Sequence, residues 1–149
     1  MAVSESDQCK HSVLEIAVSA GLLCVLVLLA GNVFVLCENC AYNDKACKGA
    51  VLSAANALIS GLGGNDVRKA ALLGLNDNSG GGFCVDHPEF TKFRDVEEHG
   101  TRALEIQTRV LARLPAPFLI PNIKLEAGGR LPISRTYRLQ IGPNKEGSR

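Results

Sequence analysis

The hydrophobic and polar positions of this chain follow three successive patterns, and the first is a long apolar run. Ile16 to Leu36 is a stretch of 21 residues without a charge, in which Asn32 is the one strongly polar member. As a helix it would be about 30 Å long, which matches the hydrocarbon core of a bilayer. The run is longer than the apolar region of a signal peptide, and the segment before it is nearly neutral. We therefore predict a retained membrane helix over residues 12–37, with a cleaved signal and a buried core helix as alternatives.

The second pattern is a repeat of small residues at helical spacing. Past the apolar run no proline interrupts the chain for some 50 residues, so we expect the helix to continue. Its small residues recur at intervals of three or four: Ala46, Ala50, Ala54, Ala57 and Gly61. This face predicts a core helix packed on its own domain, or one that also packs against neighbouring copies. Glycines at 61, 63 and 64 end the helix, and Asn65 and Asp66 are expected to cap a short helix over 66–75.

The third pattern has the period of two that is typical of strands. Six positions alternate with polar residues and define one buried face: Leu104, Ile106, Thr108, Val110, Ala112 and Leu114. The proline-punctuated segment 115–121 must leave regular pairing, and 123–141 predicts a strand, a Gly-Gly turn and a strand. In that last strand Ile133, Arg135, Tyr137, Leu139 and Ile141 share one face. Residues 88–102 fit either a helix or a strand that turns at His99-Gly100.

These patterns predict an α+β fold in which an N-terminal transmembrane helix continues into a long alanine-rich helix, followed by a small antiparallel β region. The expected organisation is a short cytoplasmic N-terminus over 1–11, a transmembrane helix over 12–37, an extracytoplasmic α+β domain over 38–142 and a flexible tail over 143–149. The basic residues on either side of the run nearly balance, so charge does not decide the orientation. Four cysteines follow the run, and they favour an oxidising compartment for the C-terminal part.

The cysteines also offer candidate disulfides. If residues 37–60 form one helix, Cys40 and Cys47 lie about 10 Å apart along its axis, too far for a disulfide. Cys37–Cys40 together with Cys47–Cys84 uses all four cysteines, and Cys40–Cys84 is the main competitor. Free thiols and a zinc site built from Cys37, Cys40, Cys84 and His87 are the remaining alternatives.

Other chemistry finds little support in the sequence. The net charge is +1 and no basic patch with interleaved aromatics appears, which disfavours a nucleic-acid partner. His11, His87 and His99 have no nucleophile motif beside them. The loop 76–83 lacks the acids of a calcium site and the Gly-Lys-Ser/Thr of a phosphate cradle. We therefore predict no enzyme activity, no catalytic, cofactor-binding or metal site, and no cofactor.

Three segments in this order resemble the TadE-like family, the minor-pilin or pseudopilin-like proteins of tight-adherence pili. They are Glu15-Ile16-Ala17 before the apolar run, the alanine-rich helix entered by Asn43-Asp44-Lys45-Ala46, and the β region with "LPAPFLIP" and "RTYRLQI". The resemblance implies a single-pass, pilin-like component of a tight-adherence pilus or related secretion system in a bacterial envelope. Lys10 stands where pilin-type precursors usually carry the glycine that precedes cleavage. The alternative function is an accessory single-pass subunit of an unrelated multi-subunit membrane complex.

Three residues at the start of the predicted membrane helix are candidates for assembly. Ala17 and Gly21 form a small-xxx-small pair, which allows close helix approach in a membrane. Glu15 has two interpretations. It could complete a capping box with Ser12, or its charge could pair with a positive group on a neighbouring subunit. The expected partners are other pilin-like or membrane-complex subunits, met through the N-terminal helix, and the lipid bilayer.

Overall fold

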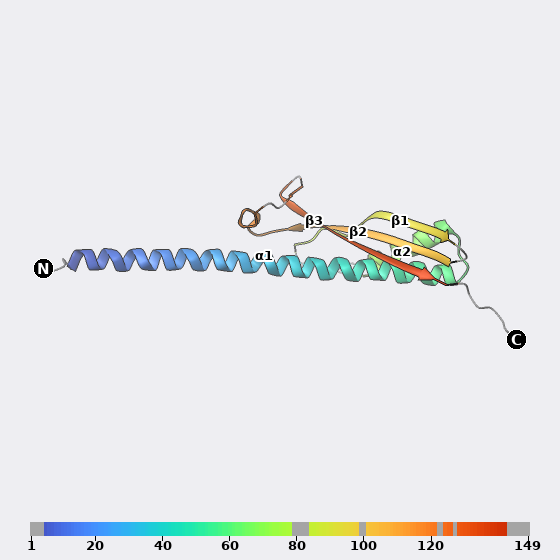
Figure 1. Ribbon diagram of the computed structural model, residues 1–149, viewed down its shortest axis with the longest axis horizontal. Helices are drawn as coiled ribbons and strands as arrows, with labels where there is room; N and C mark the ends of the chain where they lie inside the picture. The colour runs from blue at the N-terminus through green and yellow to red at the C-terminus, as the bar shows by residue number, and fades with distance from the viewer. Residues whose placement is uncertain (1–4, 79–83, 99–100, 122–123, 127, 143–149) are drawn as a thin grey trace.

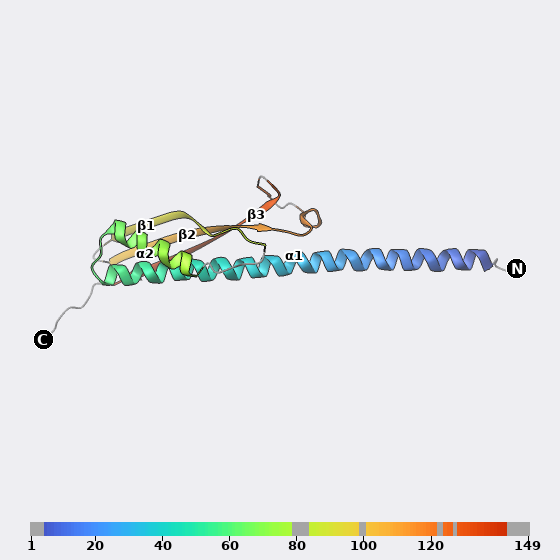
Figure 2. The same cartoon turned by 180° about the vertical axis from the view of Figure 1, so that it is seen from behind.

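A single long helix is the axis of the molecule. The computed structural model describes residues 5–78, 84–98, 101–121, 124–126 and 128–142. Helix α1 (Glu5–Ile59) is 55 residues long and continuous. Figures 1 and 2 show that the rest of the chain lies along its C-terminal half, while the N-terminal half extends alone beyond the sheet. The predicted continuation of the apolar helix into the alanine-rich helix is confirmed.

The two helices are joined by a tight glycine turn. Beyond the end of α1 the amides of Gly61 and Leu62 donate to the carbonyls of Leu58 and Ala57, and Gly61 has φ +79°. This is the Schellman arrangement, which needs a residue that tolerates positive φ. Helix α2 (Gly64–Asp77) then begins, with Gly63 as its N-cap and no side-chain capping bond. The expected cap by Asn65 or Asp66 is therefore wrong, because the glycine turn starts α2 two residues earlier and places Asp66 in its first turn.

Three antiparallel strands form one sheet in the order β1-β2-β3. They are β1 (Glu89–Glu98), β2 (Thr101–Arg113) and β3 (Arg130–Ile141). The strand alternative for 88–102 is thus confirmed, and its turn residues 99–100 lie outside the described residues. The expected strand before Gly128-Gly129 is wrong for 124–126, where one isolated bridge pairs Glu126 with Arg130. The backbone of β3 pairs with the long central strand β2 instead.

The core lies between the sheet and the alanine face of α1. The predicted inward residues of β2 are buried, and Leu104, Ile106 and Ala112 are fully so. Opposite them, Ala46, Ala50 and the other alanines of the stripe are buried within this one chain. Short side chains let the helix and the sheet approach closely. The predicted α+β class, with a pilin-like arrangement of helix and antiparallel sheet, is therefore observed.

Helices α1 and α2 cross at two facing glycines. A Cβ atom on Gly74 would lie 2.7 Å from the carbonyl oxygen of Gly49 and closer still to the hydroxyl of Ser53. A Cβ on Gly49 would lie 2.9 Å from the carbonyl oxygen of Gly74. The crossing therefore has no room for a side chain on either helix. This close crossing packs α2 against the C-terminal half of α1.

Candidate functional site: the uncovered half of the long helix

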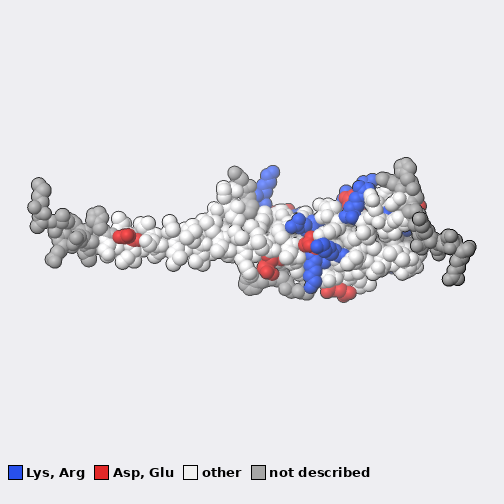
Figure 3. Space-filling model, turned by 60° about the horizontal axis from the view of Figure 1, so that its bottom comes forward, with Lys and Arg blue, Asp and Glu red and all other residues white. Residues whose placement is uncertain are grey.

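The N-terminal half of α1 has no protein cover. Every residue from Ser12 to Leu28 is exposed, and Leu22 and Leu23 each expose 62% of their surface. Among the described residues, α1 is the helix that is long and apolar enough to cross a membrane. Over the side chains from residue 12 onward that the structure describes, Figure 3 shows this part of α1 as a narrow rod without basic groups, with an acidic group near its N-terminal end. The core-helix alternative is therefore wrong here, and the segment is a membrane span or a signal sequence.

The candidate assembly residues Glu15, Ala17 and Gly21 all lie on this uncovered half. A Cβ on Gly21 would meet no atom within 4 Å, so the position is open to a neighbouring helix. At about 100° per residue, Gly21 lies roughly 20° around the axis from Asn32, on the side of α1 that carries the sheet. Glu15 lies about 120° away from Gly21 by the same count. The structure thus does not bring the three residues onto one face: Ala17 and Gly21 lie on one side of α1, and Glu15 lies on another.

The interpretation of Ser12 and Glu15 as a capping box is wrong. Helix α1 begins at Glu5, so Ser12 is in the helix interior and is not an N-cap. The helix macrodipole acts mainly within the first turn, and Glu15 lies almost three turns from the start. Neither local effect accounts for an acid at this position.

A pair of hydrogen bonds joins α1 to the loop after β2 at the level of Asn32. The amide nitrogen of Asn32 donates to the carbonyl of Ala116 over 2.7 Å, and the amide of Ala116 donates back to the Asn32 oxygen over 3.0 Å. Asn32 and Ala116 are each 1% exposed. Both polar ends of the Asn32 side chain are therefore satisfied at the point where the uncovered helix meets the sheet domain.

A second buried asparagine ties α1 to two strands. Asn43 donates to the carbonyl of Ile133 on β3 over 2.9 Å and accepts from the hydroxyl of Thr108 on β2 over 2.7 Å. Asn39, one turn earlier, donates to Val35 within the helix, and its side-chain oxygen is buried without a partner among the described groups. The two Asn43 bonds fix the rotation and axial position of the sheet on α1, because the donor and the acceptor of this side chain each have a partner on a different strand.

Charged and aromatic side chains also connect α1 to β3 at the edge of the interface between the helix and the sheet. The hydroxyl of Tyr137 donates to Asp44 over 2.5 Å, and Lys48 pairs with Asp44 at 2.7 Å while lying over the Tyr137 ring. The hydrogen bonds from Lys48 and then Tyr137 lower the pKa of the Asp44 carboxyl. The predicted inward face of β3 thus uses Tyr137 to hold the helix.

The predicted disulfides are absent. All five cysteines with described side chains are free: Cys24, Cys37, Cys40, Cys47 and Cys84. The Cys47 thiol is buried 3.7 Å from the carbonyl oxygen of Ile106, whereas the backbone carbonyl of Cys84 accepts from the amide of Arg113. Ile106 and Arg113 are separated by roughly 23 Å along β2, far beyond the reach of a disulfide. Cys37 and Cys40 also remain thiols, the first exposed and the second half-buried.

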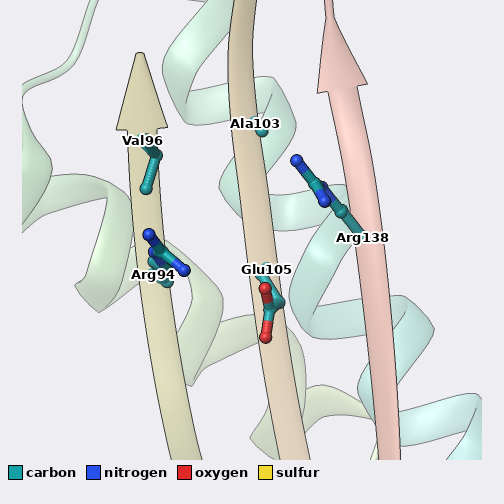
Figure 4. Close-up of a pocket in the computed structure, with 5 residues that line it drawn as sticks. All are labelled: Arg94, Val96, Ala103, Glu105 and Arg138. Carbon is teal, nitrogen blue, oxygen red and sulfur yellow. The ribbon is translucent and has the colours of Figure 1, made fainter. Parts of the chain in front are cut away.

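The outer face of the sheet carries a shallow polar hollow of about 200 Å³. Arg94, Glu105 and Arg138 stand in one row across the three strands, with Val96 and Ala103 beside them (Figure 4). Glu105 is already paired with Lys92 at 2.6 Å, and this hydrogen bond lowers the pKa of the Glu105 carboxyl. The hollow therefore holds a charged cross-strand ladder and no nucleophile.

Metal-type ligands are not gathered either. Within the described part of the chain, no three His, Cys, Asp or Glu side chains lie close enough to hold a metal ion. His87, the histidine of the zinc alternative, is an exposed loop residue beside the ion pairs of Asp86 with Arg113 and Arg130.

Sequence reasoning missed the asparagines as structural residues. Asn32, Asn39 and Asn43 follow one another at spacings of seven and four, which places them on one face of a helix. A polar stripe at this spacing, in line with the alanine stripe, was the signal that could have identified the sheet-facing side of α1.

Comparison of the chain with protein-family models, curated proteins and solved structures found no match.

Proposed function

We propose that this chain is a single-pass membrane subunit of a pilin-like assembly, of the kind that the TadE-like resemblance implies. The observation that carries the proposal is the division of α1. One half is bare and apolar over the length of a bilayer, and the other half is the central helix of a small α+β domain. This is the layout of a protein that is anchored by the helix around which its soluble domain is built. In this proposal the domain is a structural unit, and no catalytic centre is assigned to it.

The structure supports retention of the helix over its removal as a signal. Asn32 and Val35 belong to the apolar run, yet both are buried by the sheet domain. Cleavage near the end of the run would remove Asn32 and leave the buried amide of Ala116 without its acceptor, whereas the carbonyl of Ala116 would keep the hydrogen bond from Leu119. Unpaired buried groups of this kind destabilise a fold by about 1–3 kcal/mol each. We infer that the segment stays attached.

The face of α1 opposite the sheet supports assembly through this helix. Lys45, Leu52 and Ile59 remain exposed on the C-terminal half of α1, and Leu52 and Ile59 expose 61% and 68% of their surface. Exposed apolar side chains thus continue beyond the membrane segment along the same helix. A neighbouring subunit can pack along α1 without displacing the sheet. Ala17 and Gly21 would serve one neighbour, and Glu15 another.

The test is site-specific photo-crosslinking in intact bacterial membranes. A photoreactive residue at Gly21 should crosslink to pilin-like or pilus-platform subunits. The same photoreactive residue at Leu73, which is exposed on α2 outside the membrane segment, is the matched control and should not give these crosslinks. Crosslinks to a bioenergetic or transport complex would support the alternative, an accessory subunit of an unrelated complex. Loss of the chain from the membrane pellet on carbonate extraction would refute the membrane anchor itself.

An accessible thiol offers a test of orientation. Cys84 is exposed in the structure, and we propose that it faces the outside of the cytoplasm. In a variant whose other cysteines are replaced by serine or alanine, a membrane-impermeant maleimide should label Cys84 in intact spheroplasts, and Cys84→Ser in that variant should remove the label. Labelling of Cys84 only after lysis would place the domain in the cytoplasm.

A further inference from the structure

The depth of Asn32 in the bilayer can be bounded by counting along the helix. A hydrocarbon core of about 30 Å takes about 20 helical residues. Counted from Ser12 the far boundary falls at Gly31, and counted from Ile16, after the charge of Glu15, it falls at Val35. Asn32 lies between these limits. The loop that binds Asn32 therefore lies at the bilayer surface if α1 spans the membrane.

The loop has an unusual composition for a solvent-exposed connection. Residues 114–121, which we call the clasp loop, read Leu-Pro-Ala-Pro-Phe-Leu-Ile-Pro and contain no polar side chain. Phe118 at its tip is 78% exposed, the largest exposure among the exposed large hydrophobic residues of the described chain. In Figure 1 the clasp loop, with the short helix η1 (Pro117–Leu119), is the part of the sheet domain nearest the bare half of α1.

The backbone of the clasp loop has few free donors. Its three prolines carry no N–H group. The amides of Ala116, Leu119 and Ile120 donate to Asn32, Ala116 and Pro117. Six of the eight residues thus present no free N–H to their surroundings. A segment enters the edge of a bilayer at lower cost when its backbone donors are paired or missing in this way.

The surroundings also fit a lipid surface. Phe34, on α1 at the same level, exposes 60% of its surface, and the bare apolar helix begins directly beside it. Lys124 and Arg113 flank the clasp loop in the sequence and are exposed, although Arg113 also pairs with Asp86, and cations at this level favour contact with lipid phosphates. The apolar loop is therefore continuous with the proposed membrane segment and is bordered by positive charge.

We propose that the clasp loop is a second membrane contact, in which Phe118 enters the headgroup–acyl boundary and sets the depth and tilt of α1. This inference rests on the proposed membrane span. Because Asn32 holds the loop to the helix through both polar ends, the loop and the helix engage the bilayer as one unit. The occupant of the exposed apolar surface is the bilayer that α1 already crosses.

The experiment uses the absence of tryptophan from the chain. Three full-length variants each carry one reporter: Phe118→Trp in the clasp loop, Leu23→Trp in the bare helix, and Leu73→Trp on α2. Each is reconstituted into phosphatidylcholine vesicles that contain lipids brominated at shallow or deep acyl positions. All three replaced side chains are at least 62% exposed, so none of the changes disturbs the core.

We expect Phe118→Trp to lose most of its emission with shallow bromines and little with deep ones. Leu23→Trp should be quenched most by the deep bromines, and Leu73→Trp by neither. Quenching of Leu23→Trp without Phe118→Trp would overturn the loop contact and leave the span standing. A blue-shifted but unquenched Phe118→Trp would assign the surface to a second copy or another protein and would also overturn the proposal. No quenching at Leu23→Trp would refute the span and, with it, the loop contact.

Discussion

Thr108→Val isolates the hydrogen bond that joins the central strand to the long helix. Valine has nearly the shape of threonine, so the change removes the hydroxyl without opening a cavity. The Asn43 oxygen, 2.7 Å from that hydroxyl and fully buried, then has no donor. Leaving a buried acceptor unsatisfied costs about 1–3 kcal/mol. We expect the sheet to open from α1 more often by the corresponding factor, about 5- to 150-fold.

Cys47 reports this opening directly. Its thiol is buried under the sheet one turn beyond Asn43, and burial raises the pKa of the thiol. In a full-length protein whose other cysteines are replaced by serine or alanine, alkylation of Cys47 requires the sheet to leave the helix. The labelling rate in detergent micelles therefore measures the opening equilibrium, and Thr108→Val should label about 5- to 150-fold faster than its parent.

The matched control is Thr136→Val on the outer face of β3. Thr136 is exposed and pairs through its backbone with Gln107, so the same chemical change removes no buried bond. It should label at the parent rate. Equal labelling of Thr108→Val and Thr136→Val would refute the claim that the Asn43–Thr108 bond holds the sheet on the helix. If Asn43 and Thr108 act as a pair, the double variant Asn43→Ala/Thr108→Val should differ from the sum of the two single variants by a coupling of about 0.5–3 kcal/mol.

Three further predictions concern other parts of the molecule. Gly74→Ala should destabilise the domain by about 1–3 kcal/mol in thermal unfolding, because its Cβ meets backbone of α1, whereas Gly64→Ala, with open space around it, should not. The pKa of Asp44 is lowered in the fold, so its carboxylate stabilises the protein when the pH is above the ordinary pKa of 3.8, and this stability is lost as the pH falls through the folded pKa. The difference in melting temperature between wild type and Asp44→Asn should therefore shrink between pH 7 and pH 3. A difference that stays constant over this range would contradict the assignment. Glu15→Gln should insert normally, since the residue is far from the helix start, but should fail to co-purify with partner subunits if its charge pairs with one; normal co-purification would leave Glu15 without a role in assembly.

The spacing of apolar residues predicted the elements that bury one face. The alternation from Leu104 to Ala112 predicted the inward face of β2, because a strand with one covered side must place apolar residues at every second position. The alanine spacing likewise predicted the covered face of α1. For the segment that became β1, the pattern was compatible with a helix or a strand, and only pairing with β2 decided between them.

Predictions that depended on local signals alone were less successful. Asn65 and Asp66 are good capping residues, but the glycine turn had already started α2 at Gly64. Ser12 and Glu15 have the spacing of a capping box, but α1 begins at Glu5. In each case the helix begins at least one residue before the capping motif, so the motif does not lie at the start of the helix.

The apolar run, the alanine stripe and the alternation of β2 were determined by the sequence itself, since burial of one face leaves a period that can be read along the chain. Which distant residues meet was decided only by the tertiary structure. Cys47 and Cys84 were a possible disulfide pair in the sequence, yet they lie beside Ile106 and Arg113, which are roughly 23 Å apart along β2. Asn32 stood out as a polar residue in an apolar run, and its partner, Ala116, lies 84 positions away. A hydrogen bond between a side chain and a distant backbone group leaves no period in the sequence, because it depends on how the whole sheet is placed along the helix.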